Sequence, residues 1–207
     1  MQIQEIFSNL LEPQKIIATF GLIGVILIVF AESGLFFGFF FPGDSLLFTA
    51  GFFASQDLLP ILLLLIGTFI SAVAGDSFGY WFGRRTGPSL FSKEDSHFFK
   101  KKYAEQAQEF YEKHGKKTII LARFMPIVRT FAPIVAGIGN MQYRTFVFYN
   151  IIGGFIWSFG LTLLGYFLGT NIPNADSYLI PIIIVIIFTS FLPAIIHFCK
   201  HLFKKDK

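Results

Sequence analysis

Four long apolar runs constrain this chain more than any other feature of its sequence. They occupy residues 15–31, 58–82, 146–168 and 178–199, and each is close to the roughly 20 residues that a helix needs to cross a bilayer. The composition agrees, since 54% of the residues are hydrophobic, 14% are charged and the mean hydropathy is +0.62. The sequence therefore predicts an all-α membrane protein with about four transmembrane helices, and not a soluble helical core.

The basic residues predict how these helices are oriented. Nine of the 17 Lys and Arg lie between residues 82 and 118, and four more follow Cys199, whereas 31–57 and 145–199 contain none. The positive-inside rule places the central loop and the C-terminus in the cytoplasm. Counting the crossings back along the chain places the N-terminus there as well.

Two further apolar segments, 32–57 and 121–137, do not fit simple crossings. The first is interrupted by Pro-Gly at 42–43 and the second by Pro126 and Pro133. A continuous helix is disfavoured at proline, and non-helical backbone at membrane depth is tolerated only inside protein or beside water. We therefore expect two re-entrant helical hairpins, the first entering from outside and the second from the cytoplasm.

An internal repeat supports this arrangement. When residues 50–83 are aligned with residues 136–169, an offset of 86, ten of the 34 positions are identical. The first identical pair is Ala50 with Ala136, and the last is Gly83 with Gly169. Each unit contains one hairpin and one crossing, so the second unit must be inverted, as in many transporters. We predict a single membrane domain over 1–207, with repeat one at about 32–83, a cytoplasmic loop at about 84–117, repeat two at about 118–169 and a C-terminal helix at about 178–199.

The cytoplasmic loop has its own periodicity. Phe99, Tyr103, Ala107, Phe110 and His114 recur at helical spacing, and charged or polar residues fill the other faces. This pattern predicts an amphipathic helix lying at the membrane interface. A soluble regulatory helix is the alternative.

Four charged residues lie in the broken segments: Glu32, Asp44, Arg123 and Arg129. A charge at the centre of a membrane helix costs roughly 2.5–3.5 kcal/mol on insertion scales, so such residues usually pair or line a polar pathway. Pro126 separates the two arginines, and a bend there allows both guanidiniums to point at one place. A fold at 42–43 brings the two acids close in the same way, so the hairpins are predicted to deliver all four groups to a shared centre.

The residue types indicate the chemistry of this centre. Arginine stays protonated, and its planar fork suits phosphate or carboxylate. Desolvated Glu and Asp change protonation readily. We therefore assign phosphate binding to Arg123 and Arg129 and proton coupling to Glu32 and Asp44. The alternative is that two buried ion pairs only lock the hairpins together.

Two other charged residues are accessory candidates. Asp76 either neighbours the centre or pairs with Arg84, and Arg84 is otherwise a positive-inside anchor. We predict no catalytic residue, cofactor or metal site. Because there is neither a P-loop nor a nucleophile elbow, the sequence does not indicate an enzyme. The net charge of +4 comes from the loop and the tail and does not indicate nucleic-acid binding.

Three motifs together resemble the DedA family, also called the SNARE-associated or VTT-domain family. They are FPGD after Glu32, AGDSFGYWFGRRTG at 74–87, and RFMPIVRTFAPIVAG at 123–137, and the resemblance covers about 21–169. It implies a bacterial inner-membrane protein with opposed re-entrant hairpins. The family's important acids match Glu32 and Asp44, and its important arginines match Arg123 and Arg129. Its Gly-Asp motif falls at 75–76, and this chain has PGD where many members have PGE.

The resemblance also implies a range of functions. Some bacterial members are implicated in recycling undecaprenyl phosphate, others in proton-motive-force homeostasis and resistance to cationic antimicrobials, and eukaryotic relatives scramble lipids. The leading hypothesis is a flippase for a lipid phosphate, most readily undecaprenyl phosphate, coupled to protons. The alternatives are a proton-driven transporter of a small solute or ion, a lipid scramblase, and a scaffold for envelope enzymes. Membrane lipids and a second copy of the chain are the expected partners.

Overall fold

The computed structural model describes residues 13–35, 38, 41–91, 117–172 and 181–185, and within these ranges the regular elements are helices and none is a strand. Three segments are long and apolar enough to cross a membrane: Lys15–Gly34, Ile61–Thr86 and Tyr143–Asn171. In sequence they coincide with three of the four apolar runs that were predicted to cross. The fourth, at 178–199, lies outside the described residues apart from 181–185, which are helical. The predicted amphipathic helix at 99–114 also lies outside them.

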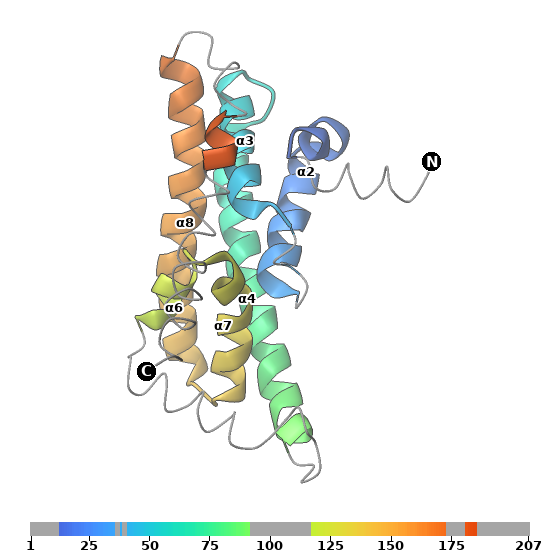
Figure 1. Ribbon diagram of the computed structural model, residues 1–207, viewed down its shortest axis with the longest axis vertical. Coiled ribbons are helices and arrows are strands. Elements are labelled where there is room, and N and C mark those ends of the chain that lie inside the picture. Colours follow the sequence, from blue (N-terminus) through green and yellow to red (C-terminus); the bar gives the residue numbers. More distant parts are fainter. Residues whose placement is uncertain (1–12, 36–37, 39–40, 92–116, 173–180, 186–207) are drawn as a thin grey trace, which may run out of the picture.

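Two long helices form the centre of the molecule. Helix α4 (Ile61–Phe91) and helix α8 (Tyr143–Asn171) run antiparallel and side by side (Figure 1). A buried hydrogen bond of 2.8 Å joins the hydroxyls of Thr68 and Ser158 across them. Helix α4 continues to Phe91, so the predicted boundary between repeat one and the loop, at 83–84, falls inside a helix.

The first hairpin is formed by α2 (Pro13–Gly34) and α3 (Gly43–Ser55). In Figure 1, α2 descends to about half the height of the molecule, and α3 rises from there. The hairpin was expected to begin at Glu32, and this is wrong. No helix breaker interrupts residues 31–33, so the helix continues through Glu32. Helix α2 consists of two helical segments joined at the non-helical backbone of Gly21, whose φ of 57° suits glycine, and the second segment continues from Leu22 through Glu32 to Gly34.

The second hairpin is formed by the short helix α6 (Thr118–Ala122) and by α7 (Pro126–Ile138). Pro126 occupies the first turn of α7, where its missing N–H costs nothing, and Met125 before it is extended. The predicted break at Pro126 is confirmed. The break predicted at Pro133 is wrong, because α7 continues through that residue. Whether the two hairpins enter a bilayer from opposite faces stays a prediction.

The short helices α3 and α7 are arranged as inverted equivalents. Each starts near the middle of the molecule, and α3 runs up while α7 runs down (Figure 1). Helix α3 packs on α8, and α7 packs on α4, so each hairpin contacts the long helix of the other repeat. The 86-residue offset relates Gly51 to Gly137, and a Cβ at either one would overlap a backbone carbonyl of that long helix, at Thr162 and at Tyr80. Glycine permits these close contacts.

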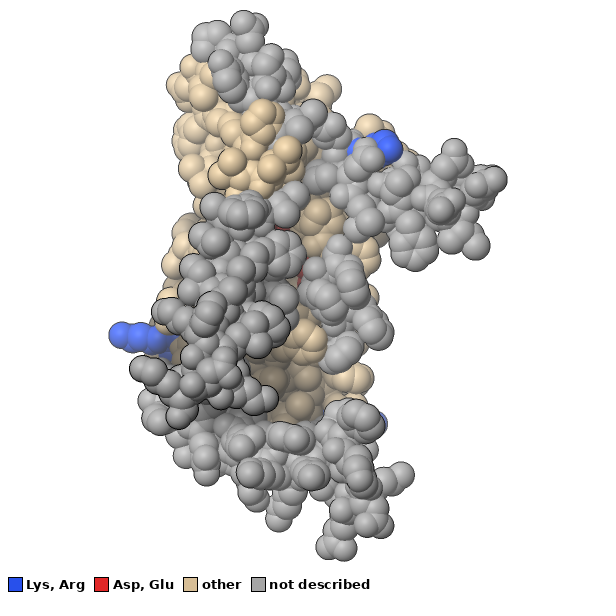
Figure 2. Space-filling view, viewed as in Figure 1, with Lys and Arg blue, Asp and Glu red and all other residues tan. Residues whose placement is uncertain are grey.

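The outer surface is apolar, as a lipid-facing surface requires. In Figure 2 nearly all of the described atoms on this face are tan, and acidic atoms show only as traces near mid-height. The exposed large side chains of the three long segments include Leu27, Leu62, Ile70, Phe148 and Leu164. The acids of the broken segments therefore face inward.

Candidate functional site

The interruptions in the helices place four charged side chains at the middle of the molecule. Glu32 lies in the last turn of α2, and Asp44 lies in the first turn of α3. Arg123 directly follows α6, and Arg129 lies in the first turn of α7. The residues that break the helices therefore also position the charges, as the sequence predicted.

Arg129 holds two carboxylates from the other hairpin. Its Nη2 pairs with Oε1 of Glu32, and its Nη1 pairs with Oδ1 of Asp44. Glu32 is completely buried and Arg129 is 8% exposed, whereas the Asp44 side chain is 16% exposed. Three helices, α2, α3 and α7, thus meet at one guanidinium.

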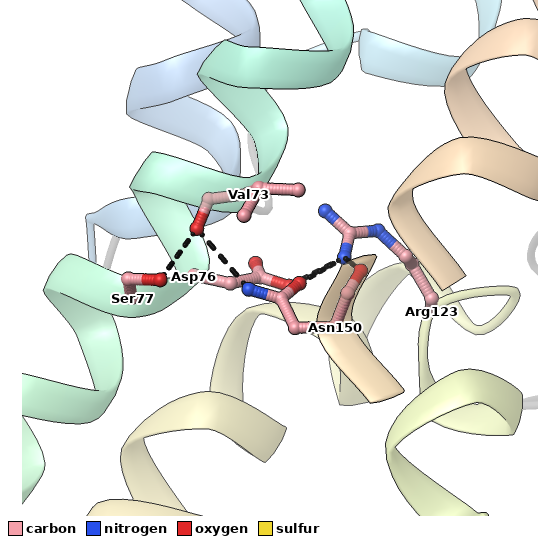
Figure 3. A network of polar contacts seen from close by, with 5 residues as sticks. All are labelled: Val73, Asp76, Ser77, Arg123 and Asn150. Carbon is pink, nitrogen blue, oxygen red and sulfur yellow. Dashed lines mark hydrogen bonds and ion pairs between the residues drawn. The ribbon is translucent and has the colours of Figure 1, made fainter. Parts of the chain in front are cut away.

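Arg123 belongs to a second polar cluster, on α4 and α8 (Figure 3). Its Nη1 lies 2.8 Å from Oδ2 of Asp76 and also donates to the backbone and side-chain oxygens of Asn150. The Asn150 amide in turn donates to the carbonyl of Val73 at 3.1 Å, and the Ser77 hydroxyl donates to that same carbonyl at 2.7 Å. Asn150 thus ties α8 to α4 and leaves its Oδ1 aimed at the arginine.

Trp157 of α8 lies between the two clusters. Its indole Nε1 donates to Oδ1 of Asp44 at 2.7 Å. The guanidinium carbon lies 4.8 Å from the ring centroid for Arg129 and 5.6 Å for Arg123, both within the range of a cation–π contact. One buried aromatic side chain therefore contacts both arginines and an acid.

The predicted shared centre is only partly as expected. Glu32, Asp44 and Arg129 meet, but Arg123 pairs with Asp76 and not with the hairpin acids. Asp76 is therefore a neighbour of the centre and not the partner of Arg84. Arg84 is exposed and donates to the Tyr80 hydroxyl at 2.9 Å, which leaves it no contact with the centre among the described residues.

Trp157 was not among the site residues predicted from the sequence. A tryptophan in the middle of a crossing was the available signal, because membrane tryptophans usually gather at the two interfaces. Asn150 was not assigned to the site either, although it bonds α8 to α4 and contacts Arg123.

The site contains more negative than positive charge. Three carboxylates, from Glu32, Asp44 and Asp76, face two guanidiniums, which leaves an excess of one negative charge when all the acids are ionised. Charges buried in a protein are tolerated when they are paired. An incoming anion would add to the excess, so its binding favours proton uptake by one of these acids.

Some buried polar atoms of the site have no hydrogen-bond partner in the described part of the chain. They are Nη2 of Arg123, Nε of Arg129 and Oε2 of Glu32. Buried polar atoms without a partner are rare in native proteins, because desolvation without a hydrogen bond costs free energy. The two arginine nitrogens are available to a ligand.

The class of protein defined by this fold is a helical membrane protein with a buried charged centre between two broken hairpins. The VTT domain model matches residues 41–167. The chain is 48% identical to Protein DedA of Escherichia coli strain K12 over 177 residues, which cover 84% of this chain and 80% of that protein. It is 46% identical to an uncharacterised membrane protein of Mycobacterium leprae over 184 residues, which cover 89% and 82%.

A more distant relative is the inner membrane protein YqjA of E. coli K12, which is 33% identical over 168 residues, covering 79% of this chain and 73% of YqjA. No solved structure matches. This chain therefore belongs to the VTT-domain, or DedA, family of membrane proteins.

Proposed function

We propose that this protein is a transporter, and not an enzyme, that moves a lipid phosphate between the leaflets of the bacterial cytoplasmic membrane with coupling to protons. Undecaprenyl phosphate is the substrate we expect. The location is supported by the three apolar helices and by the relative named as an inner membrane protein.

The observation that most supports a phosphate substrate is the pair of unsatisfied arginine donors. Arg123 Nη2 and Arg129 Nε are buried, and both guanidiniums contact Trp157. Arginine binds phosphate oxygens through several nitrogens at once. A phosphate beside Trp157 would satisfy both donors, while the polyprenyl chain stays among the lipid-facing apolar side chains.

The excess negative charge of the site supports proton coupling. A phosphate monoester brings one or two negative charges to a cluster that already has one in excess. In a low-dielectric centre this repulsion is strong. Protonation of a carboxylate would relieve it, so anion entry and proton uptake are expected to be linked.

The test is transport in proteoliposomes that contain radiolabelled undecaprenyl phosphate. A phosphatase added outside hydrolyses only the outer-leaflet pool unless the protein moves the inner pool outward. We expect the wild type and Arg85→Ala, an exposed control, to expose the whole pool. Arg123→Ala and Arg129→Ala should leave the inner pool protected.

Movement of the lipid phosphate by both site variants at the wild-type rate would disprove the proposal. If no variant moves the lipid, uptake of inorganic phosphate by the same vesicles would instead favour a transporter of a small solute. Equal movement of phosphatidylglycerol and undecaprenyl phosphate would favour a scramblase.

A further inference from the structure

The two acids that share Arg129 are held in different ways. Asp44 Oδ1 accepts from Arg129 Nη1 and from the Trp157 indole at 2.7 Å, and its helix begins one residue earlier. These donors and the N-terminus of α3 all favour the carboxylate. Glu32 is completely buried, pairs only through Oε1, and has no partner at Oε2 in the described part of the chain.

Glu32 also occupies the side of Arg129 that suits a phosphate. Nη2 and Nε form one edge of the planar guanidinium, and such an edge binds two oxygens of an anion in parallel. Glu32 covers Nη2, and Nε has no partner among the described residues. Asp44 is bound to the remaining nitrogen, Nη1, and does not compete for this edge.

From these contacts we propose that Glu32 is the proton-exchanging gate of the site, and that Trp157 is a positioning residue that keeps Asp44 ionised. Glu32 takes up one proton, its ion pair with Arg129 breaks, and two phosphate oxygens accept from Nη2 and Nε. Release reverses the step: the phosphate leaves, Glu32 loses the proton, and the ion pair forms again. This inference rests on the proposed function and adds the division of roles between the acids.

Packing restricts where the Glu32 carboxyl can lie. A Cβ at Gly43 would overlap Oε2 of Glu32, so the start of α3 closes directly over this group. Among the described residues, the charged group in contact with both acids is Arg129 of α7, and Arg123, which follows α6 and pairs with Asp76 of α4, contacts the same Trp157 ring. Asp76 is held by Arg123 and does not contact Arg129.

The first experiment measures protonation without transport. Infrared difference spectra of the purified protein in liposomes, recorded as the pH is lowered, show a carbonyl band for each carboxyl that takes up a proton. We expect the earliest band from a buried carboxyl to be absent in Glu32→Gln and present in Asp44→Asn. Asp57→Asn, in an exposed turn, is the control. Retention of that band in Glu32→Gln, whether it is then lost in Asp44→Asn or in Asp76→Asn, would overturn the inference.

The second variant tests Trp157 without touching Glu32. Trp157→Phe keeps an aromatic ring and removes the indole donor, so we expect a second buried carboxyl band, from Asp44, in the same pH range. Trp81→Phe is the matched control, because Trp81 also contacts an arginine, Arg85, but is 53% exposed. An unchanged spectrum in Trp157→Phe would show that Trp157 has only a packing role.

Transport adds a separate measurement. In vesicles with undecaprenyl phosphate and an internal pH dye, Glu32→Gln should move lipid at a rate that no longer depends on pH and should move no protons. If this variant moves as many protons per lipid as the wild type, Glu32 is not the residue that exchanges the proton. If the wild type moves no lipid phosphate, the proposed function fails, whereas the infrared result still decides which acid protonates.

Discussion

At the scale of single residues, arginine organises the centre because its nitrogens can hold separate partners at the same time. Arg129 joins Glu32 and Asp44 through different nitrogens, and Arg123 joins Asp76 and Asn150 through one. A lysine ammonium is a point charge without this planar fork. The arrangement therefore depends on the shape of the guanidinium as well as on its charge.

Removal of Arg129 is expected to destabilise the protein strongly. Arg129→Met leaves two buried carboxylates without their cation, and breaking a buried pair in this way costs about 3–5 kcal/mol. The melting temperature in detergent should fall clearly, and it should recover in part when Glu32→Gln is added. Arg85→Met, at an exposed position, should change stability by no more than about 0.5 kcal/mol. No loss in Arg129→Met would mean that the ion pairs do not hold the hairpins.

At the scale of elements, the fold depends on two short helices packed against two long ones at glycine contacts. Gly51 of α3 meets the backbone of α8, and Gly137 of α7 meets the backbone of α4. The same offset that revealed the repeat relates these two positions. Backbone contacts of this kind align the starts of α3 and α7, and hence Asp44 and Arg129, at one height.

Alanine at either glycine is expected to separate a short helix from its long partner. Gly51→Ala and Gly137→Ala each place a methyl group on a backbone oxygen, which cannot move aside as a side chain would. Both should lower the melting temperature. Gly160→Ala in α8 is the control, because a Cβ there meets nothing within 4 Å, and helix propensity alone predicts a gain of about 0.5–1 kcal/mol. If the melting temperatures of all three variants change by the same amount, tight packing at Gly51 and Gly137 does not stabilise the protein.

At the scale of the whole molecule, the path of α2 bears on the orientation of the chain. Its first turns lie in the upper part of Figure 1, as does the end of α3, whereas α4 ends and α8 begins at the bottom. A helix that ends half-way does not carry the chain across. The predicted cytoplasmic N-terminus requires α2 to be a full crossing.

Single cysteines in a Cys199→Ser background test this orientation. Asp57→Cys, between α3 and α4, should react in intact cells with a maleimide that cannot cross the membrane. Gln142→Cys, before α8, should react only after permeabilisation. From the path of α2, we expect Lys15→Cys to react like Asp57→Cys. If Lys15→Cys instead reacts only after permeabilisation, as Gln142→Cys should, the result would support a full crossing by α2 and a cytoplasmic N-terminus.

The sequence by itself determined the helices that can cross, the places where helices break and the charged residues of the centre. These features depend on local causes: run length and apolarity define a crossing, and α3 begins directly after Pro42 and α7 at Pro126, although α7 then continues through Pro133. The inverted repeat was visible for a similar reason, since its close contacts require glycine at equivalent positions.

Only the tertiary structure decided which charges meet. Arg123 pairs with Asp76, although Glu32 and Asp44 were equally open to it in the sequence. Partner choice depends on the register of α4 against α8 and on side-chain direction, and neither follows from spacing along the chain. The role of Trp157 has the same origin, because a single residue of α8 contacts both arginines only once α6, α7 and α8 are packed together.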